Sequence, residues 1–211
     1  STAIVSRLEG GAGYELLSNY CFVPDFYTEG PSREWQNNMY VYAAASGMFK
    51  RYFKWDATGR LDFAGYYAGD MFLDANARFS FYPLTSGIHL SGRFLFRSQT
   101  PDWYVQNYYS NHYVWKNGFE KTTQTRIEAQ LSIPDWRTEA AFSYALLGNR
   151  IYYDTLGVAS QADQPVSVMT ATLTQNFRIW YFRLDHRLLL QFSSNQDVLP
   201  LPLFSANLRY Y

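Results

Sequence analysis

The chain has 211 residues, a length at which barrels form a single all-β domain, and its 18 Lys and Arg residues balance 18 Asp and Glu residues. The zero net charge offers no basic patch for nucleic acid, and the lack of any apolar run near ~18 residues excludes a helical membrane protein. The 19 Tyr and 16 Phe residues favour strands and fit the aromatic girdles of membrane barrels.

Alternation of apolar and polar residues predicts about ten strands. The clearest covers residues 70–81, where each odd position from Met71 to Phe81 is apolar and the even positions include Asp74 and Arg78. A tilted strand needs ~9–11 residues to cross a bilayer, so this length fits a membrane-spanning strand. In chain order the predicted strands are 1–20, 39–53, 60–63, 70–81, 88–97, 119–133, 136–146, 166–177, 182–192 and 203–211.

Long loops and short turns alternate between these strands. Long polar loops are predicted at 24–38, 99–117 and 148–165, with a Pro-containing loop at 195–202. Short turns are predicted at 56–59, 83–87, 134–135 and 178–180, and a brief connection at 66–70 is expected on the long-loop side. Short turns at one end and long loops at the other are typical of an outer-membrane barrel.

A soluble barrel or sandwich would also alternate, with its apolar face inward. Strand length, aromatic content and loop asymmetry argue against it. The prediction is therefore an all-β, antiparallel, up-and-down transmembrane β-barrel, with residues 1–211 as a single outer-membrane barrel domain. No charged-then-apolar leader opens the sequence, so any signal peptide has been removed or lies outside this segment.

Three short motifs resemble the putative porin family of Bacteroidota outer membranes. They are G-Y-Y-A-G-D at 65–70, L-T-Q-N-F at 173–177 and Q-F-S-S-N-Q-D-V-L-P-L-P at 191–202, which A-N-L-R-Y-Y follows. The resemblance implies an outer-membrane β-barrel without catalytic residues. Members of that family are longer, so the chain is expected to be an internal portion of a larger barrel. Ten strands filled with charged side chains would also be plugged, whereas open porins use about 16–18 strands.

Parity places most charged residues on one face, which is expected to line the lumen, because Arg or Lys facing lipid at the midplane costs ~2–4 kcal/mol. Such side chains either set ion selectivity or pair structurally to stiffen the wall. The candidate lumen-lining residues are Lys50, Asp74, Arg78, Arg93, Arg126, Glu128, Arg183, Asp185 and Arg187. Parity adds Arg7, Glu9, Glu15, Lys54, Asp62, Arg97, Arg137 and Glu139 to the same face.

Catalysis and metal binding find little support, and no catalytic residue, cofactor or metal is expected. The three histidines, His89, His112 and His186, form no H-x-x-x-H or H-E-x-x-H pair, and Cys21 is alone. His186 is unusual, because parity places it on the apolar face. It would fit an envelope lipase or deacylase, a register shift, a site near the membrane interface, or a contact with another subunit.

The sequence therefore predicts a porin-like barrel of the bacterial outer membrane that passes small hydrophilic solutes by diffusion. Its expected partners are the lipid bilayer and other outer-membrane proteins, with no nucleic acid. The alternative is a non-conducting barrel subunit, structural or docking, of a larger outer-membrane complex, where Lys121 and His186 on the apolar face would mark a protein-covered patch. A soluble barrel that binds an apolar ligand is the third hypothesis.

Overall fold

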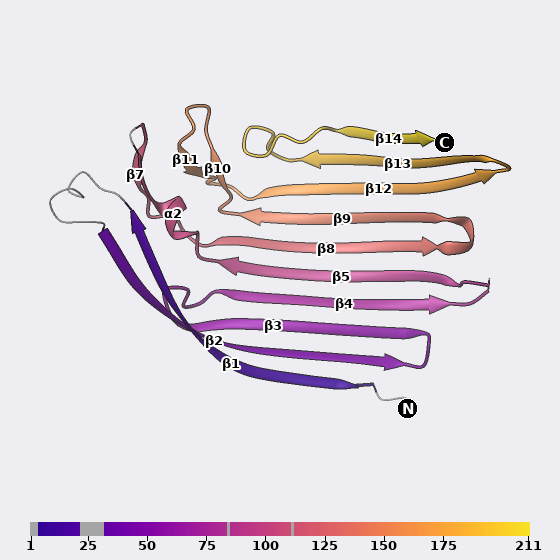
Figure 1. Ribbon diagram of the computed structural model, residues 1–211, viewed down its shortest axis with the longest axis horizontal. Helices are drawn as coiled ribbons and strands as arrows, with labels where there is room; N and C mark the ends of the chain where they lie inside the picture. The colour runs from indigo at the N-terminus through magenta and orange to yellow at the C-terminus, as the bar shows by residue number, and fades with distance from the viewer. Residues whose placement is uncertain (1–3, 22–31, 84, 111) are drawn as a thin grey trace.

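A computed structural model describes residues 4–21, 32–83, 85–110 and 112–211. Its main element is one ten-stranded antiparallel sheet in which neighbours in the chain are neighbours in space (Figure 1). The strands, in sheet order, are β1 (Arg7–Cys21), β2 (Ser32–Phe49), β3 (Phe53–Gly65), β4 (Met71–Phe81), β5 (Ile88–Gln99), β8 (Thr122–Ile133), β9 (Thr138–Gly148), β12 (Val166–Ile179), β13 (Phe182–Ser193) and β14 (Phe204–Tyr210). The predicted ten-stranded, up-and-down all-β fold is confirmed.

The connections at the two ends of the sheet differ in length. One end carries the short turns β2–β3, β4–β5, β8–β9, the last formed by the 3-10 helix η1 (Pro134–Trp136), and β12–β13. The other end carries α2 (Trp103–Gln106), the hairpin β6 (Asn107–Tyr109) with β7 (Val114–Lys116), and the hairpin β10 (Ile151–Tyr153) with β11 (Ala159–Gln161) (Figure 1). The short 66–70 connection lies at this long-loop end, as expected.

Several predicted boundaries are wrong. Residues 56–59 were expected to form a turn, but they lie inside β3, where Asp56 pairs with Ser46 on β2 and with Asn76 on β4. Pairing on both sides outweighs the local turn preference of the D-A-T-G sequence. The real turn starts at Lys50, whose φ of 50° is left-handed.

The polar loop expected at 24–38 is also shorter than predicted, because β2 already begins at Ser32. Residues 24–31 of that loop lie outside the described residues. The other two long loops are not irregular throughout, since each contains a small hairpin.

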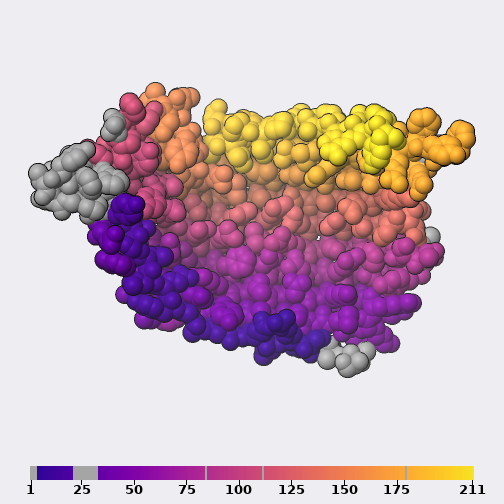
Figure 2. Space-filling view, in the orientation of Figure 1, coloured from indigo at the N-terminus to yellow at the C-terminus, as the bar shows by residue number. Residues whose placement is uncertain are grey.

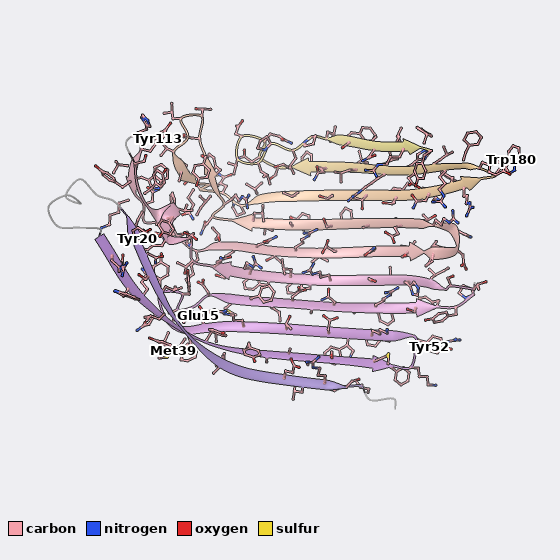
Figure 3. The ribbon with its side chains drawn as sticks, in the orientation of Figure 1. Glu15, Tyr20, Met39, Tyr52, Tyr113 and Trp180 are labelled. Atoms are coloured by element: carbon pink, nitrogen blue, oxygen red, sulfur yellow. The ribbon has the colours of Figure 1, made fainter. Side chains whose placement is uncertain are left out.

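Beyond the end of β3, β1 and β2 continue as a two-stranded ribbon that bends away from the sheet (Figure 3, near Glu15 and Met39). The register between β2 and β3 shifts between Met39 and Tyr40, and Gly65 ends β3 with a φ of 102°. A bulge and a free two-stranded ribbon both increase strand twist, which accounts for the bend. The ribbon contacts α2 through a hydrogen bond in which Trp103 Nε1 donates to Glu34 Oε2 at 3.0 Å.

The two faces of the sheet differ in chemistry and in exposure. Across the described residues only five apolar side chains are buried, so the sheet does not enclose an apolar core. Large apolar side chains on one face are exposed instead, with exposed fractions of 76% for Leu8, 55% for Ile127 and 51% for Phe142. The opposite face contains buried polar groups such as Asp62 and Ser143. A soluble sandwich or barrel would hide the apolar face, so this arrangement is that of a wall with lipid outside.

Aromatic residues are present at both ends of the sheet. Tyr52 and Trp180 lie at the short-turn end, and Tyr20 and Tyr113 lie at the long-loop end (Figure 3). Trp180 and Tyr181, at the tip of the β12–β13 turn, are each 80% exposed. Such positions match the aromatic girdles at the two membrane interfaces. No helix in the described ranges has the length and apolar character needed to cross a membrane.

The sheet is open in the part of the chain that is described. The strand order is linear, so β1 and β14 form its two edges, and they lie at opposite sides of the molecule (Figure 2). Within the described ranges, each edge carries backbone groups without a strand partner.

Candidate pore lining

The polar face is built by alternation and by the register between strands. In β4 the even positions Asp74, Asn76 and Arg78 point to this face, and the register places Arg93 opposite Asn76 and Glu128 opposite Arg93. Side chains directly opposite each other on one face interact across strands. A row of charged groups therefore follows from the sequence once the register is set.

Six residues of the polar face form a central charge cluster, consisting of Asp56, Asp74, Asn76, Arg93, Arg126 and Glu128. Arg93 binds Asp74 with two hydrogen bonds, Nε to Oδ1 at 2.9 Å and Nη2 to Oδ2 at 2.6 Å. Arg93 also lies 3.7 Å from Glu128, which pairs with Arg126 at 2.6 Å. Asn76 Nδ2 extends the cluster by donating to Asp56 Oδ2 at 2.9 Å. Four neighbouring strands are thus joined through side chains as well as backbone.

A hollow of about 490 Å³ lies over this cluster. Its lining comes from β3, β4, β5, β8 and β9 and includes Lys54, Arg78 and Gln130. Because one depression spans five strands, the polar face is the hollowed side of the sheet. Polar groups that line a depression of this kind are suited to contact water and hydrated solutes.

A second group, the loop-end cluster, joins β1, β2 and β3 near the long loops. Arg60 donates to Asp62 at 2.9 and 2.7 Å and lies 3.3 Å from Glu15, and its guanidinium stacks 3.6 Å from the centroid of the Tyr40 ring. Asn38, fully buried, donates to Asp62 Oδ1 at 2.5 Å. These contacts fix the wall at the point where the β1–β2 ribbon bends.

Asp70 clamps the β3–β4 connection to the next strands. Its carboxylate accepts the Thr100 amide at 2.9 Å, the Thr100 hydroxyl at 2.7 Å and Lys121 Nζ at 2.7 Å. Lys121 also donates to Ala68 O. The prediction that Lys121 interrupts the apolar face is therefore wrong, because it precedes β8 and its side chain reaches back over this connection.

Next to this clamp, burial raises the pKa of the Tyr67 hydroxyl. A tyrosine with its ordinary pKa is already neutral at pH 7, and the raised pKa extends this neutral range of Tyr67 to higher pH. Tyr67 lines a smaller depression of the polar face together with Arg60, Asp70 and Arg97.

The structure brings together four of the nine candidate lining residues, namely Asp74, Arg93, Arg126 and Glu128. Arg78, Arg183, Asp185 and Arg187 share their face but lie outside the cluster. Lys50 does not lie in a strand: it starts the β2–β3 turn, and Arg137, added by parity, likewise caps η1 with a φ of 51°.

Sequence reasoning missed two contributors, Asp56 and Arg60. Asp56 was lost when residues 56–59 were interpreted as a turn, whereas Arg60 was placed beside Asp62 in the predicted strand 60–63 but was not named as a lining residue. The signal was available, since the alternation continues without a break from Lys54 to Asp62. Two-residue periodicity over nine positions is stronger evidence than turn composition over four.

His186 does lie on the apolar face. The β12–β13 register runs unbroken through it, opposite Gln175, so a register shift is excluded. Its ring contacts Phe177 and Tyr210, and its buried Nε2 has no hydrogen-bond partner among the described residues.

The other histidines are unremarkable chemically. His89 Nδ1 is 2.8 Å from Ser80 Oγ, and His112 is exposed in a long loop. Across the residues that the structure covers, no group of three His, Cys, Asp or Glu side chains is arranged to hold a metal ion.

An antiparallel sheet with one exposed apolar face, one charged and hollowed face, and its long loops all at one end defines a wall of a membrane β-barrel. The sequence matches the family described as Putative porin over residues 6–211, and the chain belongs to that family. Membership implies embedding in a membrane and a porin-like β-structure of the outer-membrane type. The family description is that of a porin and names no enzyme activity. No curated protein matches the chain closely enough to serve as a relative.

Proposed function

We propose that the protein is a porin of the bacterial outer membrane, through which small hydrophilic solutes diffuse passively. The observation that carries the proposal is the polar face: charged and hydrogen-bonding side chains follow one another across the strands, over a hollow, while the opposite face is apolar and open. In a membrane the first face needs water and the second needs lipid. An aqueous channel satisfies both.

The experiment is a conductance measurement in planar bilayers with the folded protein purified from the outer-membrane fraction. Stepwise ion conductance is expected, and the same preparation unfolded by heat is the control for contaminating channels. A folded protein that inserts but gives no steps would overturn the proposal.

Two edges of the sheet have to be paired before it can lie in a membrane, because lipid satisfies no backbone hydrogen bonds. We propose that β1 and β14 pair with further strands, so that residues 1–211 belong to one larger barrel domain. The intact mass of the native protein tests this point. A mass well above 24.6 kDa supports the larger barrel, and a mass equal to it means that ten strands close alone around a plugged interior.

A second candidate is a non-conducting barrel subunit that docks other outer-membrane proteins. A polar row on the apolar face favours it: Thr138 Oγ1 lies 2.5 Å from Gln175 Oε1, and His186 stands opposite Gln175 with an Nε2 that has no partner among the described residues. This candidate predicts co-purification with partners after mild detergent extraction, weakened by His186→Ala but not by Leu188→Ala on the same face. Conductance without any stable partner would exclude it.

A further inference from the structure

Charged side chains are divided unevenly between the two ends of the sheet. A row of directly opposed residues crosses it from Lys54 through Arg78, Ser91, Gln130, Ala141 and Thr172 to Leu189. In this row and on its short-turn side the described chain has nine basic residues and three acidic ones, Asp135, Glu139 and Asp185. The basic residues, here called the short-turn basic group, are Lys50, Arg51, Lys54, Arg78, Arg137, Arg178, Arg183, Arg187 and Arg209.

Most of the basic group lies on the polar face and is not neutralised there. Arg78, Arg183 and Arg187 form no ion pair with any described residue. Asp185 stands opposite Arg209 but accepts its hydrogen bond from the Tyr211 hydroxyl, at 2.7 Å. The charge that is not neutralised by ion pairs among the described residues at this end of the polar face is therefore positive.

The register also sets like charges against each other. Lys54 lies directly opposite Arg78, and Arg178 lies directly opposite Arg183. Like charges in opposed positions destabilise a sheet, so these pairs contribute nothing to holding the wall together.

Acidic residues nearer the long-loop end of the same face form ion pairs instead. Asp74 and Glu128 pair with arginines in the central charge cluster, and Glu15 and Asp62 pair with Arg60. Paired carboxylates exert little field on a passing ion, whereas unpaired guanidinium groups exert a strong one.

We propose that the short-turn basic group makes the channel prefer small anions, such as phosphate or carboxylates, over cations. The inference rests on the proposed porin function. Rings of Arg and Lys are the usual lining of anion-passing pores, and a positive potential in a narrow, low-dielectric channel raises the local concentration of anions. The selective position is the short-turn end, which in outer-membrane barrels faces the periplasm.

The test is the zero-current potential of the full protein in a planar bilayer that separates concentrated from dilute KCl. The wild-type potential is expected to have the sign of chloride preference. The double substitution Arg183→Gln and Arg187→Gln should shift it toward zero, whereas Arg183→Lys with Arg187→Lys should leave it unchanged. The matched control, Lys116→Gln with Arg150→Gln, removes two positive charges from the long-loop end and should not shift it.

Absence of conductance from folded wild-type protein overturns the porin function and this inference together. Conductance with potassium preference, or with a potential that Arg183→Gln and Arg187→Gln leave unchanged, overturns the inference alone. If the glutamine variant does not fold, the sign of the wild-type potential still decides, because potassium preference overturns the inference and chloride preference supports it.

Discussion

Asp74 on β4 and Arg93 on β5 face the same side of the sheet and are joined by two hydrogen bonds of 2.9 and 2.6 Å. They are not directly opposite, since Arg93 opposes Asn76, so the pair bridges diagonally between neighbouring strands. Both side chains would lower the stability of the protein if they faced lipid at this depth. Their mutual pairing on the hollowed face links the fold of the wall to a water-filled interior.

Arg93→Gln should lower the free energy of unfolding by about 1–2 kcal/mol, because it breaks a two-point ion pair with a mostly buried carboxylate and removes a contact to Glu128. The measurement is urea unfolding from lipid vesicles. Arg78→Gln is the control, since Arg78 has no ion pair in the described chain. Equal losses for the two variants would contradict the cluster's structural role.

The two faces of β4 should differ in how much stability is lost when one new charge is introduced. Ala75→Arg places a guanidinium on the apolar face near the middle of the strand and is expected to cost ~2–4 kcal/mol of stability in vesicles. Asn76→Arg, one residue later, turns to the polar face and should cost far less. If both variants lose the same stability, the assignment of the faces is wrong.

Asp70→Asn should loosen the β3–β4 connection, because the neutral amide loses the ion pair with Lys121 and has one acceptor where the carboxylate has two. A buried hydrogen-bonded charge of this kind is worth about 1.5–3 kcal/mol. Limited proteolysis of whole cells or vesicles, read by mass spectrometry, should show faster cleavage near residues 66–70. Asp163→Asn in the exposed part of a long loop serves as control, and equal cleavage rates for both variants would contradict the clamp.

His186→Phe is expected to stabilise the protein by about 1–3 kcal/mol in vesicles, because it removes a buried ring nitrogen that has no partner in the described part of the chain and leaves an apolar ring between Phe177 and Tyr210. The comparison is His89→Phe on the polar face, which breaks the contact with Ser80 and should destabilise. A loss of stability in His186→Phe would contradict the view that Nε2 lacks a hydrogen-bond partner.

Much of the wall could be predicted from the sequence because alternation has a period of two, and a strand that separates lipid from water keeps that period over its whole length. In β4 the alternation from Met71 to Phe81 predicted both faces correctly, and parity even placed His186 on its unusual side. The prediction failed where the chain leaves a strand: Lys50, Arg137 and Lys121 have the parity of strand residues but belong to turns or connections. Parity has no meaning there, because the backbone no longer alternates.

Contacts between strands could not be predicted, since they depend on register. The sequence places Arg60 and Asp62 on one face, but only pairing with β1 and β2 brings Glu15 and Asn38 to them. The same holds for the bond between Trp103 and Glu34, which depends on how a bent ribbon meets a loop.

The central claim is that water lies against the polar face and lipid against the apolar one. Single cysteines placed along β4, in a background where Cys21 is replaced by Ser, test it with a membrane-impermeant thiol reagent applied to the protein in vesicles. Cysteines at Asp74, Asn76 and Arg78 should react, and those at Leu73, Ala75 and Ala77 should not, so that reactivity alternates with a period of two. Uniform protection or uniform reactivity along the strand would contradict the account.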